Sequence, residues 1–474
     1  MAAREPTNPS LPFALRRDAT APMLTSLIRD VLGLSQIPLF SPRLGGSRPD
    51  SLQFNEDGTF QISIFNDLHF GENAWDQWGP QQDFNTLKVM ETVLDAEPSD
   101  LVVLNGDLIT GDNAFLHNGS TYIDRLVAPM VRRGLPWASA YGNHDHQYNL
   151  SGGSILARER RFPGAMTTDM VRDPRAGTTN YYLPVYGADC EAARRTGDTS
   201  YFLPRPGRHC TPELILWFFD SRGGFLYQQH NKTSGERLGH ENWVHPSAVS
   251  WFRRTNRQLM RSFGGTIVPS LAFVHIPVQA LLALQMQHGQ DGSIDPHRQP
   301  GINDDYPLSP QAQGWCPDGR DRAGCDYGGQ DVPFMRALVD TPGLMAVFSG
   351  HDHGNTWCHK WDRLVPGMAV KGNGLNLCFG QHTGYGGYGN WVRGGRQILV
   401  TREMLKAREV DTWIRLETGD VVGSVSLNAT YGKDVYPATT NHKTYCPTCI
   451  YSKDSSSSVI VSRRALRHSQ PRRL

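Results

Sequence analysis

The stretch Asp100–Asp112, which reads DLVVLNGDLITGD, decides how the fold of the whole chain is interpreted. Its four apolar residues, Leu101–Leu104, end at Asn105-Gly106-Asp107, and a short β-branched run that ends in this way is typical of a buried strand. Such a strand delivers its carboxylate to the carboxyl edge of a sheet, where open α/β sheets bind ligands. Many α/β proteins place an acid there, so Asp107 alone does not indicate a ligand site, and the interpretation depends on the other polar residues that follow strands.

The segments on either side of this stretch predict a βαβ unit. An alternating strand over 60–65 precedes Asp67 and His69, and a helix over Phe84–Glu97 ends at Pro98. Because the next strand follows that helix directly, the two strands are expected to be parallel neighbours. Apolar runs that end in polar residues recur at 137–141, 214–219, 270–274 and 344–348.

The remaining chain is expected to complete one domain over residues 51–432. A single helix is expected over Tyr122–Arg133, a polar insertion over 150–211 and a short strand near Met368–Val370, before strands at 397–400, 412–416 and 421–427. Residues 1–50 lack periodicity and are expected to be a mobile leader. Residues 433–474 are rich in Ser, Arg and Pro and are expected to be a disordered tail.

Composition excludes some classes of protein. The 474 residues are 39% hydrophobic and 20% charged, which is typical of a globular chain long enough for a large core. Lys+Arg 47 balance Asp+Glu 46, which argues against a nucleic-acid partner. No apolar stretch approaches the length of a membrane span.

The compartment stays open from the sequence. No secretory signal is visible at the N-terminus, which favours the cytoplasm. Eight Cys and sequons at Asn118, Asn149, Asn231 and Asn428 are compatible with the secretory pathway instead. Cys358 and Cys378 are candidates for a disulfide, although sequence does not determine connectivity.

Polar residues that follow the apolar runs form one constellation: Asp67-x-His69, Gly106-Asp107, Gly142-Asn143-His144-Asp145, His275 and Gly350-His351-x-His353. Carboxylate, amide and imidazole donors without thiolate suit Zn, Mn or Fe. Residues at period 2 point to one side of an extended segment, so each His-containing pair can grip one ion or straddle two. His275 alone is as readily a core histidine, but the five motifs together predict a dinuclear metal site.

This order of motifs resembles the calcineurin-like metallophosphoesterases, whose signature DxH, GD, GNH(D/E), H and GHxH is present over residues 60–355. The context FNDLHFGE, WGPQQDFNT and FSGHDHGN is similar to a fungal branch grouped with a cell-cycle-linked protein phosphatase and plant purple-acid-phosphatase-29-like enzymes. The resemblance implies an α/β metallo-dependent phosphatase fold, a four-layer α/β/β/α sandwich of two mixed β-sheets.

The resemblance also implies roles for individual residues. One metal would be held by Asp67, His69, Asp107 and His353, and the other by Asp107, Asn143, His275 and His351. His144 would act on the substrate, and Asp145 would orient its ring. The two ions would be divalent or trivalent transition metals (Fe, Zn or Mn) that activate a bridging hydroxide for attack on phosphorus.

The resemblance implies hydrolysis of phosphomonoesters, either small molecules or phosphoproteins. The alternatives are a phosphodiesterase or nuclease on the same metal core, and a silent binding scaffold, which would require broken ligands. Purple acid phosphatases carry DxG in the first motif and a Tyr three residues after the bridging Asp. His69 and Thr110 occupy those positions here, so the purple tyrosinate colour is not expected.

Other candidates for substrate contact are weaker. His382 and the glycine-rich run GYGGYG at 384–389 form either a substrate loop or a flexible turn. Arg222 and Arg396 are candidates for a phosphate contact, against surface salt bridges as the alternative.

Overall fold

The structure, a computed structural model, describes residues 51–75, 77–190, 210–286, 294–305, 312–316, 318, 325 and 327–446. The predicted leader at 1–50 lies outside the described residues, as does most of the predicted tail. Within that tail, Tyr436 donates a backbone hydrogen bond to the His297 carbonyl, and Lys443 pairs with Asp304 at 2.8 Å. Packed chain therefore extends past residue 432, while the division into leader, domain and tail otherwise stays a prediction.

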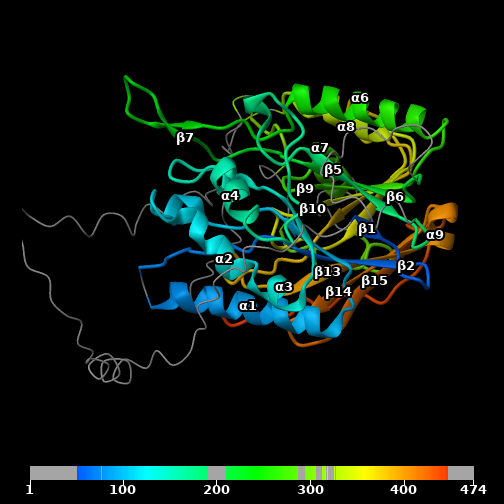
Figure 1. The fold of residues 1–474 in the computed structure, drawn as a ribbon, viewed down its shortest axis with the longest axis horizontal. Coiled ribbons are helices and arrows are strands. Elements are labelled where there is room, and N and C mark those ends of the chain that lie inside the picture. The colour runs from blue at the N-terminus through cyan, green and yellow to red at the C-terminus, as the bar shows by residue number, and fades with distance from the viewer. Residues whose placement is uncertain are drawn as a thin grey trace, which may run out of the picture. The chain divides into compact units, whose positions relative to one another are not determined.

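Two mixed sheets lie at the centre of the described chain (Figure 1). The seven-stranded sheet has the order β1 (Leu52–Gln53), β5 (Tyr181–Tyr186), β6 (Leu214–Phe219), β9 (Ser270–Val274), β10 (Leu344–Ser349), β12 (Leu375–Phe379) and β11 (Cys358–Trp361). The six-stranded sheet has the order β15 (Val421–Leu427), β14 (Val410–Leu416), β13 (Gly394–Thr401), β2 (Thr59–Phe65), β3 (Leu101–Asn105) and β4 (Trp137–Ala140). The predicted parallel pair is confirmed, because β2 and β3 are parallel and α1 connects them.

Alternation along the strands explains why the sheets stack. In β3, Leu101 and Val103 enter a core shared by both sheets, whereas Val102 and Leu104 face a second core under helices. Every residue of β3 is buried, so its continuous apolar run is that of a strand covered on both faces.

Helices cover the outer face of each sheet (Figure 1). On the six-stranded sheet lie α1 (Trp78–Ala96), α2 (Tyr122–Leu126), α3 (Ala128–Arg133) and α4 (Gly152–Glu159). On the seven-stranded sheet lie α6 (Pro246–Ser262), α7 (Gln279–Met286) and α8 (Val332–Val339), while α9 (Arg402–Ala407) follows β13. The predicted four-layer α/β/β/α sandwich is therefore confirmed.

Several local expectations were wrong. The helix expected over Tyr122–Arg133 divides at Val127, because Pro129 has no backbone N–H to continue the hydrogen-bond ladder. No strand forms at Met368–Val370, where Gly367 adopts a φ of +82° in a turn. The polar insertion contains α4 and the buried strand β5.

A two-stranded hairpin, β7 (Phe225–His230) and β8 (Arg237–Gly239), extends away from the two large sheets (Figure 1).

Among the described helices, none has the length and hydropathy that crossing a membrane requires.

Three disulfides join described cysteines: Cys190–Cys210, Cys316–Cys325 and Cys358–Cys378. The predicted pairing of Cys358 with Cys378 is confirmed, and it connects directly opposed residues of the neighbouring strands β11 and β12.

Candidate metal centre

Loops from both sheets meet where their strands end. Asp67 and His69 follow β2, Asp107 follows β3, and Asn143 and His144 follow β4, all in the six-stranded sheet. His275 follows β9, and His351 and His353 follow β10, both in the seven-stranded sheet. The sandwich therefore brings together side chains that are far apart in the sequence.

Backbone hydrogen bonds lock these loops to one another. The backbone N–H of His351 donates to Asp67 Oδ1 at 3.0 Å, and that of His144 donates to Asp107 Oδ1 at 2.8 Å. Gly350 donates to the His275 carbonyl at 3.0 Å. Each ligand loop is thus positioned by a neighbouring loop before any ion binds.

The backbone of four of these residues is left-handed. The φ angle is +54° at Asp67, +49° at His69, +50° at Asp107 and +72° at His351. Non-glycine residues seldom adopt such angles, and they cluster at functional sites where the surrounding structure imposes them.

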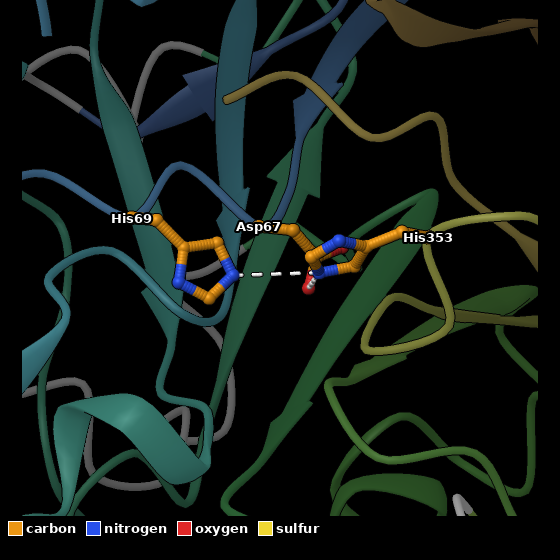
Figure 2. A group of neighbouring side chains, drawn as sticks. All are labelled: Asp67, His69 and His353. Atoms are coloured by element: carbon orange, nitrogen blue, oxygen red, sulfur yellow. Dashed lines mark hydrogen bonds and ion pairs between the residues drawn. The ribbon is translucent and has the colours of Figure 1, made fainter. Parts of the chain in front are cut away.

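The side chains form three groups whose potential ligand atoms lie within 4.8 Å of one another: Asp67, His69 and His353; His69, Asp107 and His144; and Asp107, His275 and His351. Figure 2 shows the first group, in which His69 and His353 face each other and Asp67 lies beside His353. The two Nε2 atoms are 3.4 Å apart, and Asp67 Oδ1 is 3.4 Å from His353 Nε2.

Asp107 is shared between the groups. Its Oδ1 accepts the His144 backbone N–H, so Oδ2 is the oxygen directed toward the histidines. Oδ2 lies 3.1 Å from His275 Nε2 and 3.9 Å from His69 Nε2. This is the placement that a bridging carboxylate requires, because one residue must reach both ions.

The donors fit a pair of metal ions. Asn143 Oδ1 and His351 Nε2 are buried atoms without a hydrogen-bond partner in the described part of the chain. A buried polar atom left unpaired is costly, and a bound ion would compensate for that cost. Amide, carboxylate and imidazole donors together suit first-row transition metals.

Two of the imidazoles are oriented by main-chain carbonyls. His275 Nδ1 donates to the Asn105 carbonyl at 2.9 Å, and His353 Nδ1 donates to the Tyr388 carbonyl at 2.7 Å. Each bond fixes the tautomer and leaves the Nε2 lone pair directed into the site. Such outer partners are a regular part of metal centres.

The electrostatics favour metal ligation. Burial, followed by repulsion from neighbouring histidines, lowers the pKa of His69 and of His351 to about 3, so both rings stay neutral. Burial would raise the pKa of Asp107, but His275 and His144 hold it well below its usual value. Neutral imidazoles beside an ionised carboxylate are the protonation states that ligands need. His275 differs: burial lowers its pKa, but Asp107 outweighs burial and raises the pKa to about 9, so this ring must release a proton when an ion binds.

His144 differs from the other histidines in its exposure. Its side chain is 32% exposed, whereas Asp67, His69, Asp107, His275, His351 and His353 are at most 7% exposed. Burial lowers its pKa, but Asp107 and then Asp112 outweigh burial and raise the pKa to about 10. A protonated ring at the open side of the site is suited to contact a substrate.

The expected partner of the His144 ring was wrong. Both carboxylate oxygens of Asp145 accept backbone N–H groups, from Leu108, Ile109 and Gly142. The carboxylate beside the ring is Asp112, whose Oδ1 lies 3.5 Å from His144 Nδ1. Asp145 therefore holds the ligand loops, and Asp112 is a site residue that the motif did not reveal.

The glycine-rich run forms a wall of the site. Tyr388 stacks on the His353 ring at a centroid distance of 4.0 Å, and the His382 ring lies 3.8 Å from that of His353. A Cβ at Gly387 would lie 2.5 Å from His353 Cε1, so only glycine fits there. The run is therefore not a free turn, because it packs against the ligand candidate His353.

Neither proposed arginine contacts the site through its guanidinium. Arg396 is buried and donates to the carbonyls of Phe379 and Thr356. Arg222 pairs with Glu241 at 2.8 Å, which is the salt bridge of the alternative interpretation, although the arginine is buried.

The chain is similar to known phosphatases in sequence and to a protein family in its motifs. The model of the calcineurin-like phosphoesterase family matches residues 60–355. An Arabidopsis thaliana protein named probable inactive purple acid phosphatase 29 is 27% identical over 414 residues, which are 81% of this chain and 89% of that protein.

Two further proteins are similar over most of this chain. Phosphatase DCR2 of Saccharomyces cerevisiae is 25% identical over 389 residues, which are 78% of this chain and 57% of the yeast protein. The structure of a dimetal phosphatase from Danio rerio covers 78% of this chain and 98% of its own, with 12% identity and a TM-score of 0.43.

Proposed function

Because this chain belongs to the calcineurin-like phosphoesterase family of metal-dependent phosphoric-ester hydrolases, we propose that it hydrolyses phosphomonoesters at the centre that contains Asp107. The observation that carries this proposal is that Asp107 lies in one ligand group with His69 and in another with His275 and His351. One carboxylate shared in this way is the arrangement of a dinuclear site.

The ligand sets would follow the predicted division. Asp67, His69, Asp107 and His353 would hold one ion, and Asp107, Asn143, His275 and His351 would hold the other. Two bound transition-metal ions supply a nucleophile at neutral pH and stabilise the negative charge that develops on phosphorus. Every position of the donor set is filled here, which argues against a silent scaffold.

His144 would contact the substrate itself. Its exposed, positively charged ring would bind the phosphoryl group or the leaving oxygen and would donate a proton to that oxygen as the ester bond breaks. Asp112 would hold the ring in place through Nδ1, which leaves Nε2 for the substrate. Asp145 would act indirectly, by fixing the backbone at Leu108, Ile109 and Gly142.

A comparison of two chromogenic esters on protein of known metal content tests this proposal. We expect two transition-metal ions per chain, and faster hydrolysis of p-nitrophenyl phosphate than of bis-p-nitrophenyl phosphate. The reverse preference would support a phosphodiesterase on the same core. Protein that hydrolyses neither ester while both ions are bound would contradict the proposed function.

We propose that the substrates include phosphoproteins, because the exposed His144 ring leaves the centre accessible to a large substrate. Release of phosphate from a phosphoserine peptide, compared with p-nitrophenyl phosphate, measures this directly.

We also propose that the chain matures in the secretory pathway. Three disulfides join Cys190 with Cys210, Cys316 with Cys325, and Cys358 with Cys378, and such bonds persist in oxidising compartments. Fractionation of cells under conditions that block thiol exchange tests this, because cytoplasmic protein with free thiols would contradict it.

A further inference from the structure

The hydroxyl of Thr110 lies between a metal-ligand candidate and an acid. Thr110 Oγ1 is 2.9 Å from His69 Nδ1 and 3.4 Å from Glu72 Oε2. The hydroxyl has one proton, and an ionised carboxylate only accepts hydrogen bonds, so Thr110 Oγ1 donates that proton to Glu72 Oε2. The lone pair that remains on Oγ1 then accepts the His69 Nδ1–H, so His69 Nε2 carries the free lone pair.

These two hydrogen bonds, here called the Thr110 relay, place the His69 proton on Nδ1. Main-chain carbonyls do the same for His275 and His353. His69 Nε2 is the atom that lies 3.4 Å from His353 Nε2 (Figure 2). With the opposite tautomer, His69 would direct a hydrogen into the ligand group and could not bind an ion there. The hydrogen-bond geometry of Thr110 thus selects the tautomer that can ligate.

The same acid holds the glycine-rich run against the site. Glu72 Oε2 also accepts the backbone N–H of Gly387, the residue before Tyr388. The Tyr388 carbonyl orients His353, as described above. Glu72 therefore links the outer contacts of His69 and His353, which are both members of one ligand group.

We propose that Thr110 and Glu72 are positioning residues that set the affinity of the ion held by Asp67, His69 and His353. This inference rests on the proposed metal centre and deepens it. It also gives a role to the position three residues after Asp107, which is Thr110 in this chain. In the part of the chain that the structure describes, Thr110 and Glu72 bond to neither His275 nor His351, so only one of the two ions should depend on them.

The test is a metal titration of the full chain. Metal-free protein is titrated with Zn²⁺ in competition with a chromophoric chelator, for wild type, Thr110→Val, Thr110→Ser and Glu72→Gln. We expect Thr110→Val to weaken one of the two binding steps by roughly 10- to 100-fold, the range for lost outer-shell partners. Thr110→Ser should restore wild-type affinity, because it returns the hydroxyl.

Controls separate this inference from the proposed function. Thr418→Val makes the same change at an exposed site and should leave both binding steps unaltered. Wild-type protein that binds no Zn²⁺ would contradict the proposed metal centre itself. Two wild-type steps that Thr110→Val leaves unchanged, or weakens equally, would overturn the relay and leave the metal centre standing.

If Thr110→Val does not fold, Glu72→Gln provides the second measurement. Glutamine retains the size of the side chain, but its neutral amide is a weaker acceptor for the Thr110 hydroxyl and the Gly387 N–H. We expect a smaller weakening of the same single step. Wild-type affinity at both steps would overturn the role of Glu72.

Discussion

Asp107 shows how one residue serves structure and chemistry with different oxygens. Oδ1 accepts a backbone N–H of the neighbouring loop, and Oδ2 faces His275 and His69. An amide at this position would keep the size of the side chain but lose the negative charge that the two proposed ions would need. The residue therefore cannot be replaced by its closest isostere without loss of the site.

Asp107→Asn is expected to lose both ions and to reduce kcat/KM for p-nitrophenyl phosphate. The loss should exceed the roughly 10- to 100-fold effect of an outer-shell change, because a ligand shared by two ions is removed. Metal analysis and kinetics on the same preparation measure this. Full activity with two bound ions would exclude Asp107 as the bridge.

Asp112→Asn is expected to act on turnover instead. Asp112 lies beside the His144 ring and touches no ligand in the proposed sets, so both ions should remain. The value of kcat should fall by less than the roughly 10²–10⁴-fold that a general acid contributes, and most for esters with poor leaving groups. Asp340→Asn, on an exposed acid paired with Arg253, is the matched control. An equal fall for good and poor leaving groups would exclude a role through His144.

The candidate ligands could be located from the sequence because each follows its strand within a few residues. Asp112 was not, because a turn at Gly111–Asn113 returns it toward His144 and no spacing rule describes that turn. Tyr388 was missed for another reason: it contributes a carbonyl, and every residue has one.

At the scale of elements, loops that follow β4 and β6 are joined by a buried ion pair. His146 Nε2 lies 2.9 Å from Asp220 Oδ2, and Asp220 also accepts the backbone N–H of Thr178. Other titratable groups face this imidazole: Asp145, Arg222 and His240. Because Asn143 and His144 belong to the first of these loops, the pair supports the site from outside it.

The stability that this pair contributes should depend on pH. Burial lowers the pKa of His146, but Asp220 outweighs burial and raises it. The stability that His146 contributes is therefore complete below the pKa of unfolded histidine, near 6.5, and is lost as the pH rises through the pKa of the folded state. Burial would raise the pKa of Asp220, yet His146 lowers it to about 2, so its contribution is lost only as pH falls from about 4 toward 2. The pair therefore stabilises most between about pH 4 and 6.5.

His146→Gln is expected to lower Tm more at pH 5.5 than at pH 9. Calorimetric melts of the two proteins at both values measure the difference. His117→Gln, on an exposed histidine, should show no comparable effect. An equal loss at both values of pH would mean that packing, rather than charge, accounts for the role of His146.

At the scale of the molecule, the proposed ligands come from both sheets of the sandwich. Asp67, Asp107 and Asn143 follow strands of one sheet, and His275, His351 and His353 follow strands of the other. The layers could be predicted through the resemblance of the motifs to the calcineurin-like metallophosphoesterases, whereas the order of strands could not. That order depends on contacts between segments far apart in the chain, such as β12 between β10 and β11.

Removal of the metals is expected to lower the stability of the whole sandwich. A ligand that binds only the folded state stabilises it by roughly 3–4 kcal/mol at 100 to 1,000 times its Kd. Melts with and without a strong chelator should therefore differ by several degrees. Asp107→Asn should melt at the same temperature in both conditions. A wild-type Tm that chelation leaves unchanged would contradict stabilisation of the folded chain by bound metal.

The left-handed backbone at Asp67, His69, Asp107 and His351 means that this site is maintained at the expense of thermal robustness. Glycine would relieve the backbone at each position, although at Asp107 it would also remove the oxygen that accepts the His144 N–H. Selection for backbone stability alone would thus favour glycine at these four positions in a relative that no longer needs catalysis. In a relative that stays active, Asp and His should persist at these positions.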